Sequence, residues 1–322
     1  MTLSIVVPMY NEADNVAALV KAVNAALAPL ELSYELVLVS DGATDGTWPA
    51  IVAASREDER VRGVALSRNF GHQHALLAGY HYARGDAVIS MDGDLQHPPE
   101  KLLELYAEWQ HGYKVVSTRR VDGTETSLFK RMSSRWFYWF FSRLSGVTLS
   151  PGSSDFRLLD RAVLDELKRV NDLDLFLRGL VTWLGFPSTT ISYQVQPRFA
   201  GSSKYDLRRM LRFSLAAVTS FSVLPLRLGI WLGFVTSGLA FVEICYIVRE
   251  YALGRTVPGW ASLMTWSSLM FGILFILLGI IGTYLGKVYE MLKGRPRFVV
   301  SALAGFEEPR ERLSSLSSEA SH

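Results

Sequence analysis

The chain has 322 residues, enough for one large domain or two ordinary ones, and its formal net charge is only +2. So small a charge argues against a general nucleic-acid binder. The single cysteine, Cys245, excludes an intrachain disulfide and a cysteine-based zinc site, and we interpret it as a small apolar packing residue. The first residues contain neither a basic nor a long apolar segment, so no signal peptide is predicted and we expect the following domain to stay in the cytoplasm.

Residues 1–118 alternate short β-branched runs with helical patterns, which is typical of an α/β protein with a parallel sheet. The runs are nearly continuous in apolar character, as expected where both faces of a sheet are covered. The predicted strands cover 3–8, 34–40, 61–66, 87–91 and 114–117. The predicted helices cover 14–27, 48–55, 71–83 and 99–110. Asn11 is a candidate N-cap for the first of these helices.

Residues 119–200 are less regular, with short strands predicted at 156–159 and 190–196. Basic amphipathic segments follow at 128–144 and 204–215. In the first of them, aromatic and aliphatic residues at helical spacing alternate with basic ones, as in helices that lie at a membrane interface. The alternative is an ordinary core-facing helix with a basic solvent face.

Two long apolar runs cover 228–248 and 261–285, and both reach the roughly 20 residues that a helix needs to cross a bilayer. Basic residues flank the pair on its outer sides, so the positive-inside rule places both flanks in the cytoplasm. The first run contains one charge, Glu243, for which a structural pairing and a proton relay both stay open. The alternative for the two runs is a pair of buried core helices.

These patterns predict a multi-pass protein of the cytoplasmic membrane whose α/β domain and termini are cytoplasmic. Its predicted regions are an α/β domain at 1–200, an amphipathic juxtamembrane segment at 201–227, transmembrane helices at 228–248 and 261–285, and a polar tail at 286–322.

The strongest motif, Asp-Gly-Asp-Leu-Gln-His-Pro-Pro at 92–99, directly follows the fourth predicted strand. Ligands of open α/β sheets bind beyond the carboxyl ends of the strands. Asp92 and Asp94 can converge there on one hard cation, and Gln96 adds a neutral oxygen. A divalent ion held by few protein oxygens keeps coordination positions for substrate phosphates. We therefore predict a Mg²⁺ or Mn²⁺ site at Asp92, Asp94 and Gln96.

Two further motifs follow the first and second predicted strands, Pro-Met-Tyr-Asn-Glu at 8–12 and Ser-Asp-Gly-Ala-Thr-Asp-Gly-Thr at 40–47. Turn formation and helix capping can explain each of them alone. Three motifs at consecutive strand ends, all at one edge of the sheet, favour a nucleotide site instead.

Together these motifs resemble the inverting GT-A family that includes dolichol-phosphate mannose synthase and the bactoprenol glucosyltransferases. The resemblance covers roughly residues 3–300, and the paired C-terminal apolar runs are similar to the bactoprenol branch. Further matching segments are Ser-Arg-Asn-Phe-Gly at 67–71, Ser-Asp-Phe-Arg at 154–157 and Gly-Ser-Ser-Lys-Tyr at 201–205. The resemblance implies a Rossmann-like GT-A catalytic domain followed by interfacial and transmembrane helices.

The resemblance also implies roles for single residues. The residues that match the donor base and ribose site are Pro8, Tyr10, Glu12 and Asp41, with Asp92, Asp94 and Gln96 at the diphosphate. Those that match phosphate-binding positions and a closing loop are Arg119, Arg131, Arg198, Ser203 and Lys204. Asp155 matches an acidic residue that faces the reaction centre, so that Asp94, Asp155 and Lys204 are the candidate catalytic residues. The family commonly has two adjacent acidic residues where this chain has Ser40 and Asp41. The preferred nucleobase of the sugar donor therefore stays open.

We therefore predict an enzyme that transfers one sugar, with inversion, from a nucleoside-diphosphate sugar to undecaprenyl or another polyprenyl phosphate, for modification of cell-surface glycans. The acceptor phosphate has a second pKa of about 6 and is largely dianionic at neutral pH, so it needs little help from a base. Asp94 and Asp155 are then positioning or electrostatic residues, and a base role for one of them is the alternative. The predicted arginines and Lys204 can hold the two anions together, and a solvated surface charge is the alternative for each.

Two other functions stay open at this point. A polysaccharide synthase of the same fold typically carries a Gln-x-x-Arg-Trp motif, which this chain lacks, and a non-catalytic membrane scaffold would not need the intact Asp-x-Asp motif. His72, His74 and His81 lie close in sequence, and we expect packing or hydrogen-bonding roles for them rather than a zinc site. That the donor is glucose linked to a uridine nucleotide follows from the resemblance alone. The oligomeric state stays open.

Overall fold

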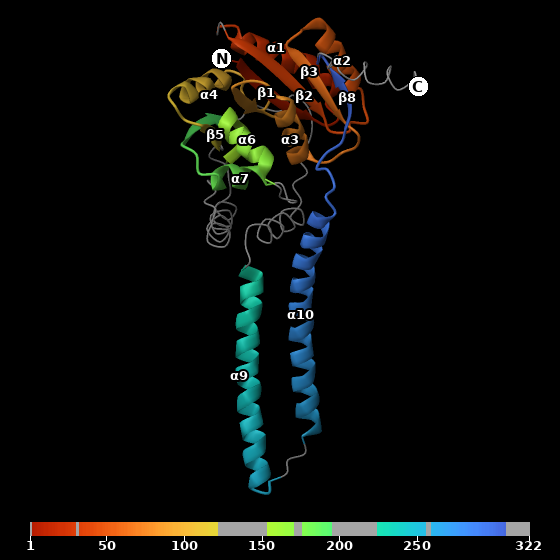
Figure 1. Cartoon of the computed structure of the whole chain (residues 1–322), viewed down its shortest axis with the longest axis vertical. Coiled ribbons are helices and arrows are strands. Elements are labelled where there is room, and N and C mark those ends of the chain that lie inside the picture. Colours follow the sequence, from red (N-terminus) through yellow and green to blue (C-terminus); the bar gives the residue numbers. More distant parts are fainter. Residues whose placement is uncertain are drawn as a thin grey trace, which may run out of the picture.

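The computed structural model describes residues 2–29, 32–121, 153–170, 176–194, 224–255 and 259–306. An α/β body with one mixed sheet occupies one end of the molecule, and two long helices, α9 (Leu224–Ala252) and α10 (Trp260–Leu292), project from it (Figure 1). The strand order is β7-β5-β6-β4-β1-β2-β3-β8. The predicted fold class, an α/β domain with a mostly parallel sheet followed by two apolar helices, is confirmed.

The centre of the sheet is parallel. It consists of β1 (Thr2–Met9), β2 (Ser33–Ser40), β3 (Val61–Leu66) and β4 (Ala87–Ser90), which match the first four predicted strands within two residues. β5 (Val115–Val121) pairs in parallel with β7 (Ser188–Gln194). Between β4 and β5 lies β6 (Ser153–Asp160), which is antiparallel to both. Because β6 is reversed, its first residues lie at the edge where the parallel strands end.

Helices cover both faces of the sheet. One face carries α1 (Val16–Leu27), α2 (Thr47–Glu57) and α4 (Lys101–Gln110), and the other carries α3 (His72–Tyr82), α6 (Arg161–Arg169) and α7 (Leu177–Trp183). Alternate side chains of β1 enter the two cores, Ile5 the first and Val6 the second, and both are fully buried. Burial on both faces explains why the strands read as continuous apolar runs.

A short strand that we did not predict, β8 (Val300–Ala304), extends the sheet beyond β3 and runs antiparallel to it. The backbone N–H of Ser67 donates to the carbonyl of Val299 at 2.9 Å, and the Ser301 hydroxyl donates to the carbonyl of Ala65 at 3.2 Å. Phe298 and Phe306 pack against the second core. Residues 300–304 are therefore part of the α/β body, although the sequence places them in a polar tail.

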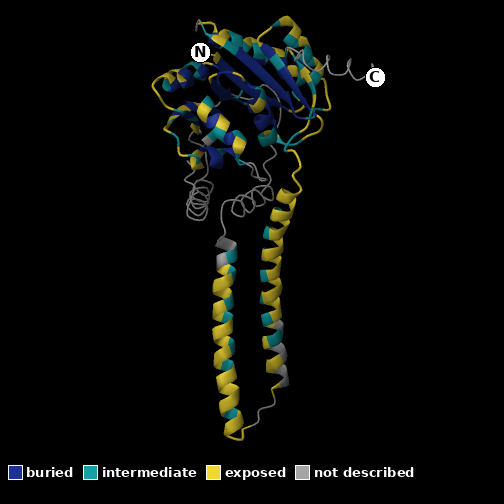
Figure 2. Ribbon diagram, viewed as in Figure 1, coloured by how far each residue is buried: buried dark blue, intermediate teal, exposed yellow. Residues whose placement is uncertain are grey.

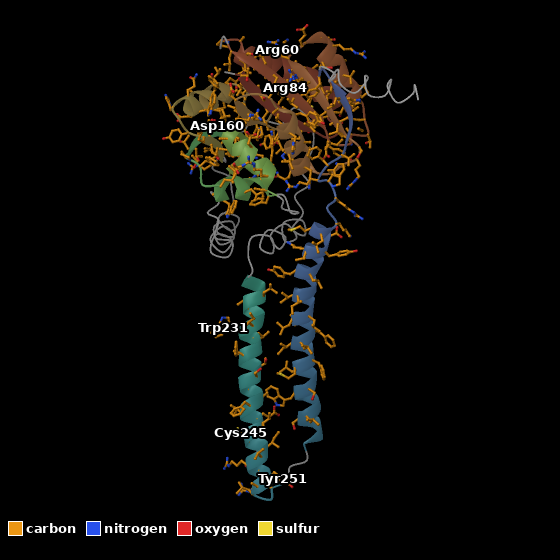
Figure 3. All side chains as sticks on the ribbon, viewed as in Figure 1. Arg60, Arg84, Asp160, Trp231, Cys245 and Tyr251 are labelled. Atoms are coloured by element: carbon orange, nitrogen blue, oxygen red, sulfur yellow. The ribbon has the colours of Figure 1, made fainter. Side chains whose placement is uncertain are left out.

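The two projecting helices are exposed along almost their whole length (Figure 2). The windows Leu228–Ala252 and Leu269–Leu292 have mean hydropathies of 1.8 and 2.3, and no part of either is buried inside the protein. Trp231, Cys245 and Tyr251 lie along α9, well away from the α/β body (Figure 3). The alternative of two buried core helices is therefore wrong, and both helices are long and apolar enough to cross a membrane.

One local prediction is also wrong, because Asn11 does not cap the first helix. A short 3-10 turn, η1 (Ala13–Asn15), precedes α1, and Asn11 itself adopts a positive φ of 54°. Its side-chain oxygen instead accepts a hydrogen bond from the backbone N–H of Thr44 at 2.9 Å, which ties the first motif to the second. The amphipathic segments predicted at 128–144 and 204–215 lie outside the described residues.

Candidate active site

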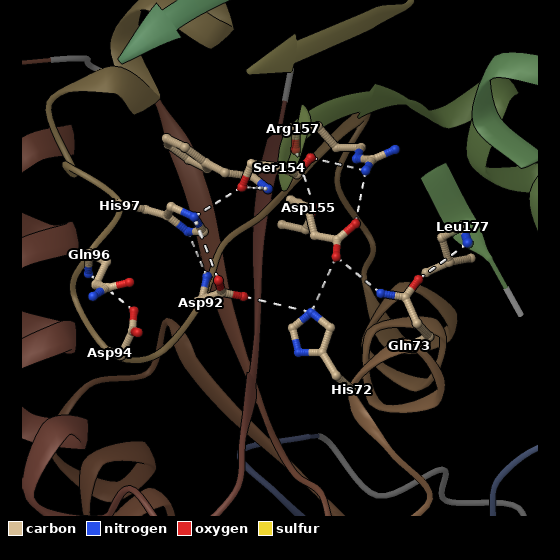
Figure 4. Close-up of polar contacts among 12 residues, drawn as sticks. His72, Gln73, Asp92, Asp94, Gln96, His97, Ser154, Asp155, Arg157 and Leu177 are labelled. Atoms are coloured by element: carbon tan, nitrogen blue, oxygen red, sulfur yellow. Dashed lines mark hydrogen bonds and ion pairs between the residues drawn. The ribbon is translucent and has the colours of Figure 1, made fainter. Parts of the chain in front are cut away.

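The predicted motifs meet at one edge of the sheet. β1, β2, β3 and β4 are mutually parallel, so the segments that follow them start side by side, and the reversed β6 begins at the same edge. Asp92 lies just after β4 and Asp155 lies at the start of β6, and the side chain of His72 contacts both carboxylates (Figure 4). The topology therefore brings residues that lie far apart in the sequence together in one site.

Asp92 lies between two histidines. Its Oδ1 is 3.7 Å from Nε2 of His72, and its Oδ2 is 3.6 Å from Nε2 of His97 (Figure 4). Burial lowers the pKa of His72, but the contact with Asp155 and the charges of Asp92 and Asp155 outweigh this and raise it above its ordinary value. The carboxylate of Asp92 is thus oriented from both sides.

His97 is fixed in the wall of the site. Its Nδ1 accepts a hydrogen bond from the backbone N–H of Asp92 at 3.0 Å, and its Nε2 lies 3.1 Å from the hydroxyl of Ser154. The ring stacks on Phe156, with ring centres 4.8 Å apart. Burial lowers the pKa of His97, which agrees with a neutral ring whose Nδ1 is an acceptor. His97 therefore shapes the turn that carries Asp92.

The turn after Asp92 places Asp94 and Gln96 on a tight loop. The backbone N–H of Gln96 donates to Oδ1 of Asp94 at 3.1 Å, and Leu95 between them has a positive φ of 58°. Gly93 contacts Glu12 so closely that a Cβ atom there would be 2.3 Å from Oε2 of Glu12. A side chain at this position would therefore displace the carboxyl group of Glu12.

Negative charge accumulates at this point. Oε2 of Glu12 is buried and has no hydrogen-bond partner among the described residues. Burial, together with the charges of Asp94 and Asp92, raises the pKa of Glu12 to about 7. No group of three His, Cys, Asp or Glu side chains arranged to hold a metal ion occurs in the described part of the chain. The edge thus brings the carboxyl groups of Glu12, Asp92 and Asp94 close together.

Asp41, which we predicted to contact the nucleotide, binds the backbone of a neighbouring loop. It is buried, and its two carboxylate oxygens accept hydrogen bonds from the backbone N–H groups of Phe70 and Gly71, at 2.8 and 2.9 Å. The loop at 67–71 lies so close to Gly42 that a Cβ there would be 2.1 Å from the carbonyl carbon of Arg68. Asp41 therefore anchors this loop against the end of β2.

Asp155 is the most heavily bonded carboxylate of the site. Its Oδ1 accepts from Arg157 and from Nε of Arg178, both at 2.9 Å, and its Oδ2 accepts from Nη2 of Arg178 at 2.8 Å and from Gln73 at 3.0 Å. Nε2 of His72 is 3.6 Å from Oδ2. Burial raises the pKa of Asp155, but the contact with His72, the hydrogen bonds from Arg178 and the charges of Arg178 and Arg157 hold it well below its ordinary value.

The other predicted site residues lie as follows. Pro8 is in the buried strand β1, and Tyr10 beyond its end is 46% exposed. Arg119 is exposed near the end of β5, in register with Ser153 of β6. The predicted phosphate-binding residues that lie outside the described residues are Arg131, Arg198, Ser203 and Lys204.

Sequence reasoning did not assign several residues of this site. His97 and Arg157 lie within recognised motifs and His72 adjoins one, so their position gave a usable signal. Gln73, whose side-chain oxygen also accepts from the backbone N–H of Leu177 at 3.2 Å, and Arg178 gave none, because single polar residues in an irregular region carry no spacing to recognise. His81 packs edge-on against Phe298 and lies outside the site.

Comparison with protein families and curated sequences gives consistent matches. The model of glycosyl transferase family 2 matches residues 4–168. An uncharacterized glycosyltransferase of Synechocystis sp. is 40% identical over 97% of this chain and 98% of its own length. A protein named bactoprenol glucosyl transferase, from Shigella flexneri prophage SfII, is 33% identical over 93% of this chain and 97% of its own. An Escherichia coli prophage homologue of such a transferase is 32% identical, over 93% and 98%.

Comparison with solved structures gives more distant matches. Glucosyl-3-phosphoglycerate synthase from Mycobacterium tuberculosis is 18% identical, with a TM-score of 0.47, over 68% of this chain and 76% of that one. Mannosyl-3-phosphoglycerate synthase from Rubrobacter xylanophilus is 20% identical, with a TM-score of 0.46, over 68% and 72%.

Proposed function

Because this chain belongs to glycosyl transferase family 2 and is a glycosyltransferase, we propose that it transfers a single hexose from a nucleoside-diphosphate sugar to a polyprenyl phosphate. One structural observation supports the proposal that the acceptor is a lipid. β8 runs antiparallel to β3 and begins beside Leu66, so α10 returns to the α/β body at the very edge that holds the site. The apolar helices and the acidic strand ends are therefore on the same side of the body.

The relatives support the finer assignment. Proteins named bactoprenol glucosyl transferase align with nearly the whole of this chain, through the two long apolar helices as well as the sheet. We infer from this likeness that undecaprenyl phosphate is the acceptor and glucose the sugar, with a uridine diphosphate donor as the first candidate. The exposed apolar surfaces of α9 and α10 suit a membrane location, with the body at its cytoplasmic side.

The oxygen donors of the site fit a divalent cation, which we assign to Asp92, Asp94 and Gln96. Hard oxygen ligands suit Mg²⁺ or Mn²⁺. The pKa of the buried Glu12 beside Gly93 is raised to about 7 by burial and by the charges of Asp94 and Asp92, so positive charge would be favoured at this point. When bound, such a cation supplies positive charge to the departing diphosphate. His72 and His97 orient the carboxylate of Asp92 for this task.

In the proposed reaction, a phosphate oxygen of the acceptor forms a bond to the anomeric carbon of the sugar. The bond from that carbon to the donor diphosphate breaks, and its electron pair leaves with the nucleoside diphosphate. The acceptor is already largely dianionic at neutral pH, so no group of the protein has to remove a proton. The chain's own contribution is to hold two anionic substrates in line, for which positive side chains are required.

The decisive experiment is a donor panel with the purified full chain in detergent and undecaprenyl phosphate, read by mass spectrometry of the lipid. We expect one hexose to be added from one donor of the panel, with release of the matching nucleoside diphosphate. Undecaprenol, which lacks the phosphate, is the matched control and should not react. A long polymer on the lipid, or no lipid product from any donor, would contradict the proposal.

A further inference from the structure

The surroundings of Asp155 bear on what this residue does in the transfer. An ionised carboxylate has about four positions at which it accepts hydrogen bonds. Arg157, Arg178 and Gln73 together donate four bonds of 2.8–3.0 Å to Asp155, two to each oxygen. These bonds fill the acceptor capacity of a carboxylate that is itself only 7% exposed.

We propose that Asp155 is a positioning residue, not the proton acceptor of the reaction, and that it acts through Arg178 on an anionic phosphate group of a substrate. This inference rests on the proposed transfer to a phosphate acceptor. To take a proton, Asp155 would have to give up one of its four bonds, three of which come from charged guanidinium groups. A carboxylate so strongly stabilised as an anion is also a weak base.

The two arginines that hold Asp155 differ in their access to a substrate. The side chain of Arg157 is only 5% exposed, whereas that of Arg178 is 36% exposed. Both Nε and Nη2 of Arg178 bond to Asp155, which fixes the plane of the guanidinium. Arg157 therefore serves to hold the buried carboxylate, and Arg178 is the one that can present its charge to a ligand.

The position of Arg178 agrees with this role. Asp92, His72, Asp155 and Arg178 form a continuous chain of contacts, with distances of 3.7, 3.6 and 2.8 Å between successive partners. One end of this chain is the carboxylate assigned to the cation, and the other end is a guanidinium. The reaction has to hold two anionic groups next to each other, and a cation at each end of the site meets this need.

A second contact holds the helix that carries Arg178. Gln73 donates to Asp155 through its amide nitrogen and accepts from the backbone N–H of Leu177, the first residue of α7, through its amide oxygen. The start of α7 is thus bound to α3, and Arg178 is the second residue of α7. Gln73 and Asp155 together set where the guanidinium lies.

A double-mutant cycle tests the inference, using Asp155→Asn, Arg178→Gln and the double variant in the transfer assay. If Asp155 acts through Arg178, each single change should lower kcat/KM about 100-fold, and the double variant should be close to either single variant. Arg178→Gln should also raise KM for the lipid phosphate more than KM for the sugar donor. Losses that multiply to about 10⁴-fold in the double variant, or full activity in either single variant, would overturn the inference.

Two further variants serve as controls. Arg178→Lys keeps the charge but not the paired geometry, and we expect it to recover about tenfold over Arg178→Gln. Arg169→Lys changes an arginine whose side chain is 75% exposed on α6, and it should keep the wild-type rate. Asp155→Asn leaves Arg157 buried without its anion and can impair folding, so the Arg178 variants carry the test if it does. No difference between Arg178→Lys and Arg178→Gln would then count against the inference.

A labelling experiment tests the same contact without any activity. In wild-type protein, the pairing with Asp155 should protect Arg178 from an arginine-directed dicarbonyl reagent, and Asp155→Asn should raise its labelling several-fold, with Arg169 as an internal reference. Unchanged labelling of Arg178 would overturn the inference. A wild-type chain that transfers no sugar to any polyprenyl phosphate would count against the proposed function alone, because the labelling result does not depend on it.

Discussion

Four aspartates at the site edge differ in their surroundings, and these surroundings determine what each can do. Asp41 and Asp155 are buried, and their oxygens are used by backbone N–H groups in one case and by arginines and a glutamine in the other. Asp92 and Asp94 are only half-buried. The first pair stabilises the arrangement of the site, and we propose that the second pair holds the cation.

The first prediction concerns Asp94. We expect Asp94→Asn to lower the rate of transfer by about 100-fold or more, because a neutral amide binds a divalent cation far less well and removes charge stabilisation from the leaving group. The melting temperature should stay nearly unchanged. The rate is measured in the lipid transfer assay, with and without chelator and with Mg²⁺ or Mn²⁺ added back.

Asp165→Asn is the matched control, because Asp165 is half-exposed on α6, outside the site. It should retain the wild-type rate. Wild-type transfer by Asp94→Asn, or full activity in the presence of chelator, would refute the assignment of the cation to this turn.

At the scale of elements, β8 links the end of α10 to the loop that Asp41 anchors. The backbone N–H of Ser67, at the start of the loop at 67–71, donates to the carbonyl of Val299. The side chain of Arg297 donates to the carbonyl of Val170, which follows α6. An edge strand that lies against β3 therefore supports one wall of the site. It also fixes where α10 meets the body.

The second prediction compares two truncations. A chain that ends after Arg297 lacks β8, and we expect its melting temperature to fall by several degrees and its transfer rate at least tenfold, since the sheet edge and the loop lose their partner. A chain that ends after Phe306 keeps β8 and should behave like the full chain. Thermal unfolding and the transfer assay measure both effects, and equal behaviour of the two truncations would contradict this role of β8.

A polar cluster remote from the site joins α1, α2 and β2. Asp58 accepts hydrogen bonds from Arg60, at 2.7–2.8 Å, and from Asn24 at 2.8 Å, and Asn24 and Arg60 both bond to the hydroxyl of Tyr34. The bonds from Arg60 lower the pKa of Asp58 to about 2. Because the folded pKa lies below the unfolded one, Asp58 stabilises the fold above about pH 4 and loses this effect as the pH falls toward 2.

The third prediction follows from the lowered pKa of Asp58 in the folded protein. Asp58→Asn should lower the melting temperature by a few degrees at pH 7 and by the same amount at pH 5. At pH 3 the difference should shrink to about half, because the unfolded carboxyl is then mostly protonated while the folded one is still ionised. Thermal unfolding in detergent at the three pH values measures it. A difference in melting temperature between Asp58→Asn and the wild type that grows toward pH 3 would contradict this direction of the pKa shift.

At the scale of the whole molecule, β8 constrains the path of the chain. Residue 300 follows α10 and lies in the same sheet as β1–β4, so the chain must leave the α/β body and return to it. If α9 and α10 cross a membrane, they form a hairpin with both outer ends on the side of the body. The basic flanks predicted this arrangement, and the position of β8 agrees with it.

The fourth prediction is a labelling test of this topology. In a Cys245→Ala background, Arg255→Cys places a thiol at the far end of the hairpin, and Glu59→Cys places one on the exposed surface of the body. A membrane-impermeant maleimide should label the first variant in intact cells and the second only after permeabilisation. Salt washing should not release either protein from membranes. Labelling of both thiols in intact cells, or release by salt, would contradict a membrane hairpin.

The sequence by itself determined the α/β class, most strand positions, the acidic strand-end motifs and the two long apolar helices. These features depend on local patterns, namely the period of apolar residues and short motifs such as Asp92 to Pro99, which are independent of distant parts of the chain. The sequence also placed the motifs at one edge, because parallel strands necessarily end on the same side of a sheet.

Only the tertiary structure decided which residues hold the acidic ones. Gln73 and Asp155 are 82 positions apart, and the contact of Ser301 with Ala65 spans 236. No local pattern encodes such pairs, since β6 reaches the site only by running antiparallel and β8 forms only where β3 offers an open edge. For the same reason the hydrogen bonds that Asp41 and Asp155 accept become visible only in the folded chain.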